Sequence, residues 1–278
     1  MSKAIFITGT GTDVGKTFVT GLILKKLNES GKNAAYFKAA MSGNVYSETG
    51  ELIPGDAVWV KQASGITQPV REMCPYIYEH AYSPHLASRL EGNPVRLDVV
   101  KKAFAKVCEA YDYVTVEGSG GILCPLDIEE NAVTGFHDSF RNTPGKSTGF
   151  PDEQFIPSDQ SIVPDKSITP DKGRHPLWLE DVIKELGLAC LIVADAGLGT
   201  INSVVLTVEY MRAKHIEIKG LIFNHFHPGN VLEEDNLRMC AWRTGLKVLA
   251  CVKDGDHELD IDAEELSALY KMQGEEKR

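Results

Sequence analysis

The chain contains 278 residues, of which 43% are hydrophobic and 24% charged, and its formal net charge at neutral pH is −10. That length suffices for a substantial core, and the acidic balance offers no basic surface for nucleic acid or an anionic membrane. No apolar run reaches about 18 residues, and no charged-then-apolar leader opens the sequence. We therefore expect a cytoplasmic protein with no nucleic-acid or membrane partner.

The cysteines predict neither a disulfide framework nor a zinc site. They are scattered, none forms a C-x-x-C pair, and no histidine cluster stands at zinc-ligand spacing. Several lie within apolar runs, which is typical of buried free thiols in a reducing cytoplasm. The only metal that we expect is Mg²⁺ carried by a nucleotide. The cysteines are Cys74, Cys108, Cys124, Cys190, Cys240 and Cys251.

The first predicted elements are a strand over residues 4–7, a loop rich in glycine, and a helix that opens at Gly15-Lys16-Thr17. This order is the setting of a phosphate-binding loop (P-loop), because backbone N–H groups and the helix dipole favour negative charge at a helix N-terminus. Lys16 would then reach the β- and γ-phosphates of a nucleotide, and the hydroxyl of Thr17 would reach Mg²⁺.

The glycine spacing of this loop departs from the usual pattern, in which about four residues separate the first glycine from Gly-Lys. Gly9 leaves five residues before Gly15, and Gly11 leaves three. The alternative is a glycine-rich turn before an ordinary helix, with Lys16 in solvent. Because Gly-Lys-Thr falls at the junction of strand and helix, we favour a subclass of P-loop proteins.

Two charged residues accompany the next predicted strand and helix. Residues 34–38 are expected to form a strand ending at Lys38, which then lies at the carboxyl edge of the sheet, where open α/β sheets bind ligands. The alternative is a strand-end lysine that merely reaches solvent. Asp56 opens a short helical pattern, and its position is about equally compatible with a site residue and with a helix N-cap.

Two later loops carry polar residues beside predicted elements. Ser83 could cap a helix that has Pro84 at its first position, which is a structural role, and His85 alone is more typical of a packed residue. The predicted strand 113–116 runs into Glu117 and a glycine-rich loop. A carboxylate followed by glycines at a strand tip is typical of the metal side of a nucleotide site. A solvated acid is the alternative.

Residues 131–174 interrupt the pattern. Six of the thirteen prolines lie between Pro144 and Pro176, and residues 156–173 contain a crude repeat of six residues. Such a stretch cannot bury a core and is far longer than a normal connection. We interpret it as a flexible, proline-rich insertion. A tolerated insertion is the favoured role, and a lid or a partner-binding arm is the alternative.

The alternation of helices and strands then resumes, with a second glycine-rich junction at residues 195–203. Alternating elements of this kind predict a mostly parallel sheet covered on both faces. We therefore expect residues 1–278 to form a single-domain, doubly wound α/β structure, a P-loop NTPase fold with helices on both faces. A helix is predicted over 177–186, and strands over 189–194, 220–223 and 247–251, with Asn224 directly after the second of these.

Five motifs in this order resemble the dethiobiotin synthetase family. The resemblance covers residues 1–125 and 177–224. One motif would be weak, but five in the right order are specific. They are residues 9–17 with the stretched P-loop, 38–43, 83–85, 116–121 and 197–202.

The resemblance implies an ATP-dependent ligase that forms C–N bonds in biotin biosynthesis. In that family, the diamine 7,8-diaminononanoate reacts with CO₂ to give a carbamate. The carbamate takes the γ-phosphoryl group of ATP as a carbamic-phosphoric anhydride, and the second amine closes the ureido ring and releases phosphate. The implied ligands are thus ATP, CO₂ and the diamine, with Mg²⁺ as the cofactor.

The resemblance also implies roles for individual residues. Lys16, Lys38 and Thr12 would be catalytic, the lysines supplying positive charge between the carbamate and the triphosphate. Mg²⁺ would bind to Thr17, Asp56 and Glu117. The nucleotide would bind to Asp13, Val14, Gly15, Lys16, Thr17, Phe18, Glu117, Gly118, Gly120 and Asn224, the last beside adenine. The substrate would bind to Thr12, Lys38, Ser42, Ser83, Gly199, Ile201 and Asn202.

A homodimer follows from the same resemblance, because the carboxylate tail of the substrate is captured in that family by the glycine-rich junction of the partner subunit. Two features depart from the family pattern. One is the insertion 131–174. The other is residues 253–262, which lack the proline-centred segment that helps to enclose the base in relatives, so the preference among nucleotides stays open.

Two other classes of P-loop protein remain as alternatives. An ATP-dependent ligase similar to cobyrinate a,c-diamide synthase carries an additional glutaminase domain, for which the residues after Asn224 leave no room. A partition-type ATPase switch places a second lysine early in the P-loop, whereas position 10 is Thr10. The acidic balance of the chain also disfavours such a switch.

Overall fold

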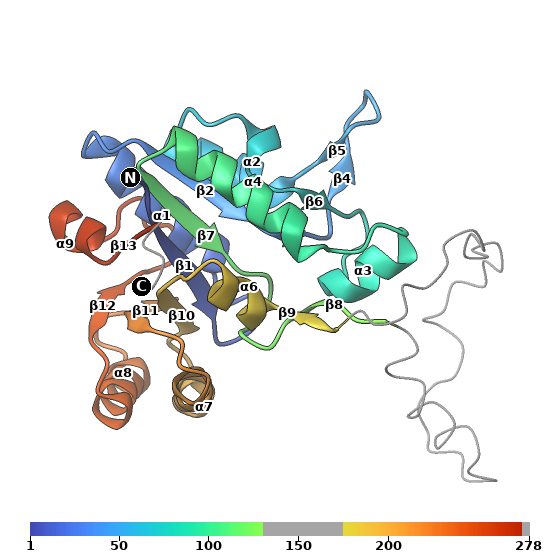
Figure 1. Cartoon of the computed structure of the whole chain (residues 1–278). Coiled ribbons are helices and arrows are strands. Elements are labelled where there is room, and N and C mark those ends of the chain that lie inside the picture. The colour runs from blue at the N-terminus through green and yellow to red at the C-terminus, as the bar shows by residue number, and fades with distance from the viewer. Residues whose placement is uncertain (130–174, 274–278) are drawn as a thin grey trace, which may run out of the picture. The chain divides into compact units, whose positions relative to one another are not determined.

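A computed structural model describes residues 1–129 and 175–273 (Figure 1). The described helices and strands belong to one compact unit, formed by Met1–Asp127 and Leu177–Arg278. A second unit, Ile128–Pro176, lies almost wholly outside the described residues, as does the predicted insertion 131–174. Within the described part of the chain, no helix combines the length and the apolar character needed to cross a membrane.

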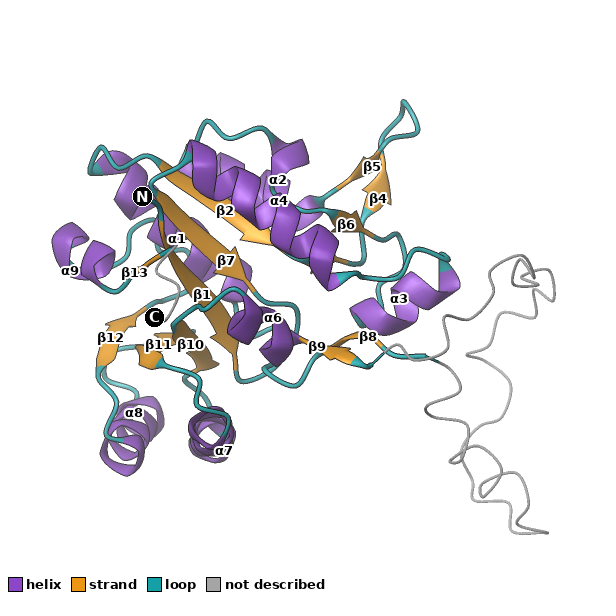
Figure 2. Cartoon of the chain, viewed as in Figure 1, coloured by secondary structure: helices purple, strands orange, loops and turns teal. Residues whose placement is uncertain are grey.

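A central sheet of seven strands organises this unit (Figure 2). Six strands are parallel, in the order β12-β11-β10-β1-β7-β2, and the short β13 pairs antiparallel with β1. This order, in which the chain crosses over from β1 to β2 and returns to β7, confirms the predicted doubly wound sheet. The strands are β1 (Lys3–Gly9), β2 (Ala34–Lys38), β7 (Tyr113–Glu117), β10 (Cys190–Asp195), β11 (Ile218–Asn224), β12 (Val248–Cys251) and β13 (Lys271–Met272).

Helices cover both faces of the sheet, as the alternating pattern predicted. Successive residues of β1 point to opposite faces, so Phe6 belongs to one hydrophobic cluster and Ile5 and Ile7 to another. The first cluster is covered by α4 (Leu97–Ala110), α6 (Leu179–Glu185), α7 (Thr200–Ala213) and α8 (Val231–Thr244). The second is covered by α1 (Lys16–Glu29), α2 (Gly55–Ser64) and α9 (Ala263–Ala268).

Short elements fill the connections. The chain forms β9 at Leu177–Trp178 before α6, where the sequence predicted the start of the helix. β9 pairs antiparallel with β8 (Pro125–Asp127), so residues 127 and 177 lie opposite each other. The other short elements are β3 (Ala40–Met41) paired with β6 (Tyr76–Ile77), the hairpin of β4 (Val45–Tyr46) and β5 (Leu52–Ile53), the 3₁₀ turn η1 (Val70–Glu72) and α3 (Pro84–Leu90).

The cysteines agree with their prediction as free thiols. Cys74, Cys124, Cys190 and Cys240 are buried, and the other two are partly buried. Burial raises the pKa of the Cys124 thiol to about 11, and the positive charges of Lys16 and Lys38 only partly oppose this. A thiol with so high a pKa stays protonated at neutral pH, which is consistent with a packing role.

The parallel strands bring their carboxyl ends to one edge of the sheet. Gly9, Lys38, Glu117, Asp195 and Asn224 are the last residues of β1, β2, β7, β10 and β11. In a doubly wound sheet this edge is where ligands bind. The strand-end residues that the sequence analysis identified therefore lie along this one edge of the sheet.

Candidate active site

A cavity of about 710 Å³ opens at this edge, over the ends of β2 and β7 and the start of α1. Most of the residues predicted to act on nucleotide, metal or substrate lie around it. It is also lined by Trp59 and Ser119, neither of which was predicted as a site residue, although Ser119 lies in the 116–121 motif and Trp59 follows Asp56 by about one helical turn. The predicted residues that line it are Thr12, Asp13, Gly15, Lys16, Thr17, Phe18, Lys38, Ser42, Asp56, Glu117 and Gly120.

The P-loop curls tightly beneath this cavity. Asp13 and Gly15 have positive φ angles of 60° and 84°, a backbone shape that glycine adopts without strain. A Cβ on Gly9 would come within 2.8 Å of Val14, so the stretched loop needs a glycine there. Gly15 stands at the N-cap of α1, and no side chain of the described residues caps the helix, which leaves the N-terminal N–H groups for an anion.

Lys16, the first residue of α1, is buried. Its Nζ donates a hydrogen bond of 2.7 Å to the carbonyl of Gly11. Burial lowers the pKa of Lys16, and the positive charge of Lys38 lowers it further, while Glu117 acts in the opposite direction. A buried lysine held by one carbonyl has ammonium donors left for phosphate oxygens.

Lys38 and Glu117 face each other across neighbouring strands. The register of β2 and β7 places them directly opposite. Lys38 Nζ donates hydrogen bonds of 2.6 Å to Glu117 Oε1 and of 2.6 Å to Asp56 Oδ2. Burial alone lowers the pKa of Lys38, but the two carboxylates outweigh it, so the pKa is raised and the lysine is protonated at neutral pH.

Glu117 accepts hydrogen bonds from three side chains, although only 1% of its surface is exposed. Its Oε1 accepts from Lys38 and, at 2.8 Å, from the Thr17 hydroxyl, while its Oε2 accepts from the Tyr36 hydroxyl at 2.9 Å. Burial and then the charge of Glu117 raise the pKa of Tyr36 well above its ordinary value, so this hydroxyl is a donor. Hydrogen bonds therefore hold both oxygens of the Glu117 carboxylate.

The three predicted metal ligands lie together and suit a divalent cation. A carboxylate oxygen of Asp56 and one of Glu117 each lie 2.6 Å from the same ammonium group, so a positive charge already stands between them. The hydroxyl of Thr17 adjoins Glu117. In the described residues, no group of three His, Cys, Asp or Glu side chains forms a metal cage. Two carboxylates and a hydroxyl, completed by phosphate oxygens, are what Mg²⁺ prefers.

Asp56 is not the N-cap of its helix, which corrects the structural alternative for this residue. Pro54 occupies the N-cap of α2, and Asp56 stands in the first turn. Ser83 does occupy the N-cap of α3 with Pro84 next to it, but its hydroxyl hydrogen-bonds to His85 Nδ1 at 2.9 Å and not to the helix backbone. Ser83 does not line the cavity.

Of two further predicted site residues, Ser42 lines the cavity and Gly118 does not. Ser42 lies at the cavity and its hydroxyl donates to the carbonyl of Tyr82 at 2.6 Å. Gly118 packs inside, where a Cβ would come within 2.9 Å of Phe6, so it is a glycine of close packing. Val14 likewise points into the core of the α1 face.

Asn224 lies beneath the P-loop and is buried. Its Nδ2 donates to the carbonyl of Val14 at 3.3 Å, and it packs so closely on Gly15 that a Cβ there would meet Nδ2 at 2.0 Å. Its Oδ1 has no hydrogen-bond partner among the described residues. Asn224 thus supports the loop from below, and its predicted contact with adenine stays a prediction.

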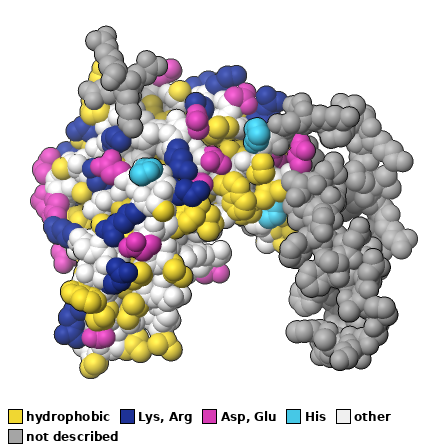
Figure 3. All heavy atoms as spheres, turned by 60° about the horizontal axis from the view of Figure 1, so that its bottom comes forward, with side chains coloured by type: hydrophobic (Ala, Val, Ile, Leu, Met, Phe, Trp, Pro, Cys, Tyr) yellow, Lys and Arg dark blue, Asp and Glu magenta, His cyan; other side chains and the backbone are white. Residues whose placement is uncertain are grey.

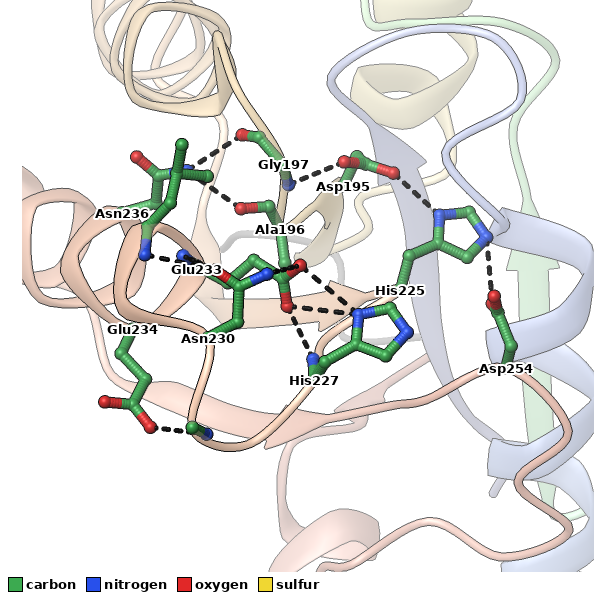
Figure 4. A network of polar contacts seen from close by, with 12 residues as sticks. Asp195, Ala196, Gly197, His225, His227, Asn230, Glu233, Glu234, Asn236 and Asp254 are labelled. Carbon is green, nitrogen blue, oxygen red and sulfur yellow. Dashed lines mark hydrogen bonds and ion pairs between the residues drawn. The ribbon is translucent and has the colours of Figure 1, made fainter.

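A polar network joins the ends of β10 and β11 to the loop before α7 (Figure 4). Asp195 accepts from the backbone N–H of Gly197 and pairs with His225 Nδ1, both at 2.6 Å. Asn236 of α8 donates at 2.9 Å to the carbonyls of Ala196 and Gly197. These contacts hold the loop that leads to Gly199, the N-cap of α7.

The second glycine-rich junction is separate from the P-loop cavity. Gly199 has a φ of 94°, no side chain in the described part of the chain caps α7, and Ile201 and Asn202 lie in its first turn. The preceding Leu198 is 90% exposed. Three of the predicted substrate-binding residues therefore stand at a helix N-terminus on the outside of the described unit.

Comparisons with known proteins identify a family and several relatives that the sequence matches. The model of a family described as an AAA domain matches residues 3–134 and 174–257. The ATP-dependent dethiobiotin synthetase BioD of Brachyspira hyodysenteriae is 41% identical over 260 residues, which cover 94% of this chain and 96% of that protein. The protein of the same name from Clostridium novyi is 40% identical over 264 residues, 94% of this chain and 92% of its own length.

Solved structures give a more distant likeness. The cell division protein FtsY from Thermotoga maritima is 13% identical, with a TM-score of 0.44, over 97% of this chain and 68% of that one. A likeness of this degree carries no argument about function.

Proposed function

The chain belongs to the ATP-dependent dethiobiotin synthetase family and is an ATP-dependent ligase, and from this premise we propose that it makes dethiobiotin from 7,8-diaminononanoate, CO₂ and Mg-ATP. The observation that carries the proposal is the second buried lysine, Lys38, which lines the same cavity as the P-loop lysine, Lys16. Lys38 adds a second protein cation beside Lys16, which would lower the repulsion between a carbamate and the triphosphate.

The proposed reaction has three steps. One amine of the substrate adds to CO₂ and loses a proton, which gives a carbamate. A carbamate oxygen attacks the γ-phosphorus of ATP, and the bond to ADP breaks. The second amine then attacks the carbon of this carbamic-phosphoric anhydride and loses a proton, the ureido ring closes, and phosphate leaves with the former carbamate oxygen.

Lys16 and Lys38 lower the repulsion between carbamate and triphosphate. Both are buried, so their charges are screened less than those of surface lysines. Preorganised positive charge at a transferring phosphoryl group supplies a large share of the rate enhancement in such reactions. Thr12 and Ser42 line the cavity with hydroxyl groups, which suit the carbamate end of the substrate.

Thr17, Asp56 and Glu117 are the proposed Mg²⁺ ligands. When bound, Mg²⁺ would neutralise charge on the β- and γ-phosphate oxygens. The chain's own part is to hold two carboxylates and a hydroxyl in place: Glu117 by its three donors and Asp56 by Lys38. The N-terminal N–H groups of α1 receive the phosphates.

We further propose that the carboxylate tail of the substrate binds to the N-terminus of α7 in a second copy of the chain. The uncapped start of α7 at Gly199, Ile201 and Asn202 supports this, because helix N-termini favour carboxylates. Apolar side chains are exposed nearby, including Leu198 in the loop before α7, Leu206 of α7 and Val231 of α8. Figure 3, with the α7–α8 side turned forward, shows hydrophobic side chains at the surface there. A homodimer would cover them.

One assay tests the proposed function. Purified protein is given ATP, Mg²⁺ and bicarbonate, with and without 7,8-diaminononanoate, and phosphate and dethiobiotin are measured together. The expected result is release of one phosphate per dethiobiotin, with little release when the diamine is absent. Release of phosphate that ignores the diamine would instead favour an ATPase switch.

A further inference from the structure

Tyr36 is a fully buried tyrosine of β2 that reaches the candidate active site from behind. It precedes Lys38 by two residues, so both side chains project from the same face of the strand. Its register partner on β7 is Thr115, but its hydroxyl extends along the strand direction to Glu117 Oε2, at 2.9 Å. Its backbone N–H is held by Gln68 Oε1 at 2.8 Å.

The two oxygens of Glu117 have different partners. Oε1 accepts from Thr17 and Lys38, which line the cavity, and among the described residues Oε2 accepts only from the Tyr36 hydroxyl. The terminal torsion of a glutamate is broad, so hydrogen bonds to one oxygen alone restrict the rotation of a carboxylate less than bonds to both oxygens do. The hydroxyl of Tyr36 supplies the bond to the second oxygen. It also satisfies an oxygen that burial has cut off from water.

We propose that Tyr36 is a positioning residue for the divalent cation: its hydroxyl fixes the rotation of Glu117 so that Oε1 is presented to the metal. This inference rests on the proposed role of Glu117 as a Mg²⁺ ligand. Groups that orient a metal ligand from behind commonly change metal affinity by about 10–100-fold when they are removed. Tyr36 itself does not line the cavity.

A purely structural hydrogen bond is the competing explanation, and the chain offers a matched control for it. Tyr78 is also fully buried, and its hydroxyl donates at 2.6 Å to the carbonyl of Asn93. Tyr78 does not line the P-loop cavity. Y36F and Y78F each remove one buried tyrosine hydroxyl, but only Y36F removes a partner of Glu117.

The test measures Mn²⁺ binding to the complex of the full chain with ADP, by the electron paramagnetic resonance of free Mn²⁺. We expect Y36F to weaken Mn²⁺ binding by about tenfold, and Y78F to leave it unchanged. The affinity for ADP without metal should be the same in both variants and in the parent chain, which reports an intact P-loop. Thermal melting of Y36F and Y78F measures how much stability each substitution removes.

E117Q separates the possible outcomes. If E117Q weakens Mn²⁺ binding and Y36F does not, the inference about Tyr36 is overturned and the metal site stands. Equal weakening by Y36F and Y78F overturns it too, because the effect would then follow stability. If neither E117Q nor Y36F changes Mn²⁺ binding, the metal role of Glu117 also fails, whereas the dethiobiotin assay judges the proposed reaction separately.

Discussion

Lys38 Nζ lies 2.6 Å from Glu117 Oε1, and both side chains are buried where β2 and β7 end side by side. The same ammonium group lies 2.6 Å from Asp56 Oδ2. A buried carboxylate without a positive partner is costly, so Lys38 stabilises Glu117, whereas the Asp56 side chain is 41% exposed and depends less on this contact. On the proposed mechanism, the lysine gives up part of this contact and turns its charge to the carbamate and the phosphate.

Lys38→Met should separate nucleotide binding from turnover. We expect the rate of dethiobiotin formation to fall by at least about 100-fold, because a preorganised charge at the transferring group is lost. ADP should still bind, since Lys16 and the N-terminus of α1 are unchanged. Steady-state kinetics and calorimetric titration with ADP measure the two effects. Turnover close to that of the parent chain would remove the proposed role of Lys38.

Thr17→Val should raise the Mg²⁺ concentration needed for half-maximal turnover. The loss of a hydroxyl beside Glu117 removes one oxygen donor from the proposed metal site, and we expect a change of about tenfold. Initial rates of dethiobiotin formation over a range of Mg²⁺ concentrations measure it.

Thr20→Val is the matched control for this change, about one turn further along α1. The Thr20 hydroxyl is buried and has no hydrogen-bond partner among the described residues. Its removal should leave the Mg²⁺ dependence unchanged and the free energy of unfolding equal or higher by up to about 1 kcal/mol. A similar Mg²⁺ dependence in T17V and T20V would contradict the assignment of Thr17.

Much of the fold and of the site follows from local patterns. Lys38 and Glu117 were both identified because each ends a buried strand, and parallel strands end at one edge. Tyr36 neither ends its strand nor carries a charge, so no sequence pattern marked it as a site residue. A tyrosine in a buried strand reads as core, and its partner Glu117 lies 81 residues away. Only the register of β2 and β7 brings the two side chains together.

Other features depended on details that a pattern does not carry. Asp56 resembles an N-cap, but the helix begins earlier, with Pro54 at the cap position. Asn224 ends a strand like Lys38 and Glu117, yet it turns under Gly15 because that glycine leaves room for its carboxamide. The β4–β5 hairpin consists of two-residue strands, too short for any period to be read.

Glu180 should make the stability of the fold depend on pH in the acidic range. Burial raises the pKa of Glu180, but Tyr210, Lys184 and Lys214 outweigh it, so the pKa lies below the ordinary 4.5. The stability that this group adds is therefore fully present above 4.5 and is lost as the pH falls through its lowered pKa.

Glu180→Gln should then lower the free energy of unfolding at pH 7 by about 1 kcal/mol. Denaturant titrations of both proteins at falling pH measure the difference, which should shrink as the parent carboxylate becomes protonated. A difference between the two proteins that stays constant at every pH would contradict this explanation.

Residues 131–174, which lie outside the described residues, are proposed to be an insertion into a single domain. Pro125–Asp127 and Leu177–Trp178 pair antiparallel, so the chain on either side is already brought together. Replacement of residues 140–172 by a short glycine-serine linker should keep dethiobiotin formation and change the free energy of unfolding by no more than about 1 kcal/mol. Loss of activity in a folded deletion variant would make the segment a functional lid.

The transfer of the γ-phosphoryl group to a carbamate oxygen is tested most directly with CO₂ labelled with ¹⁸O. The protein is mixed with the diamine, Mg-ATP and labelled CO₂ in ordinary water, and the reaction is stopped before CO₂ exchanges its oxygens with water. We predict one ¹⁸O atom in the ureido carbonyl of dethiobiotin and one in the released phosphate. Labelled dethiobiotin accompanied by unlabelled phosphate would contradict the phosphorylated carbamate and the paired roles of Lys16 and Lys38.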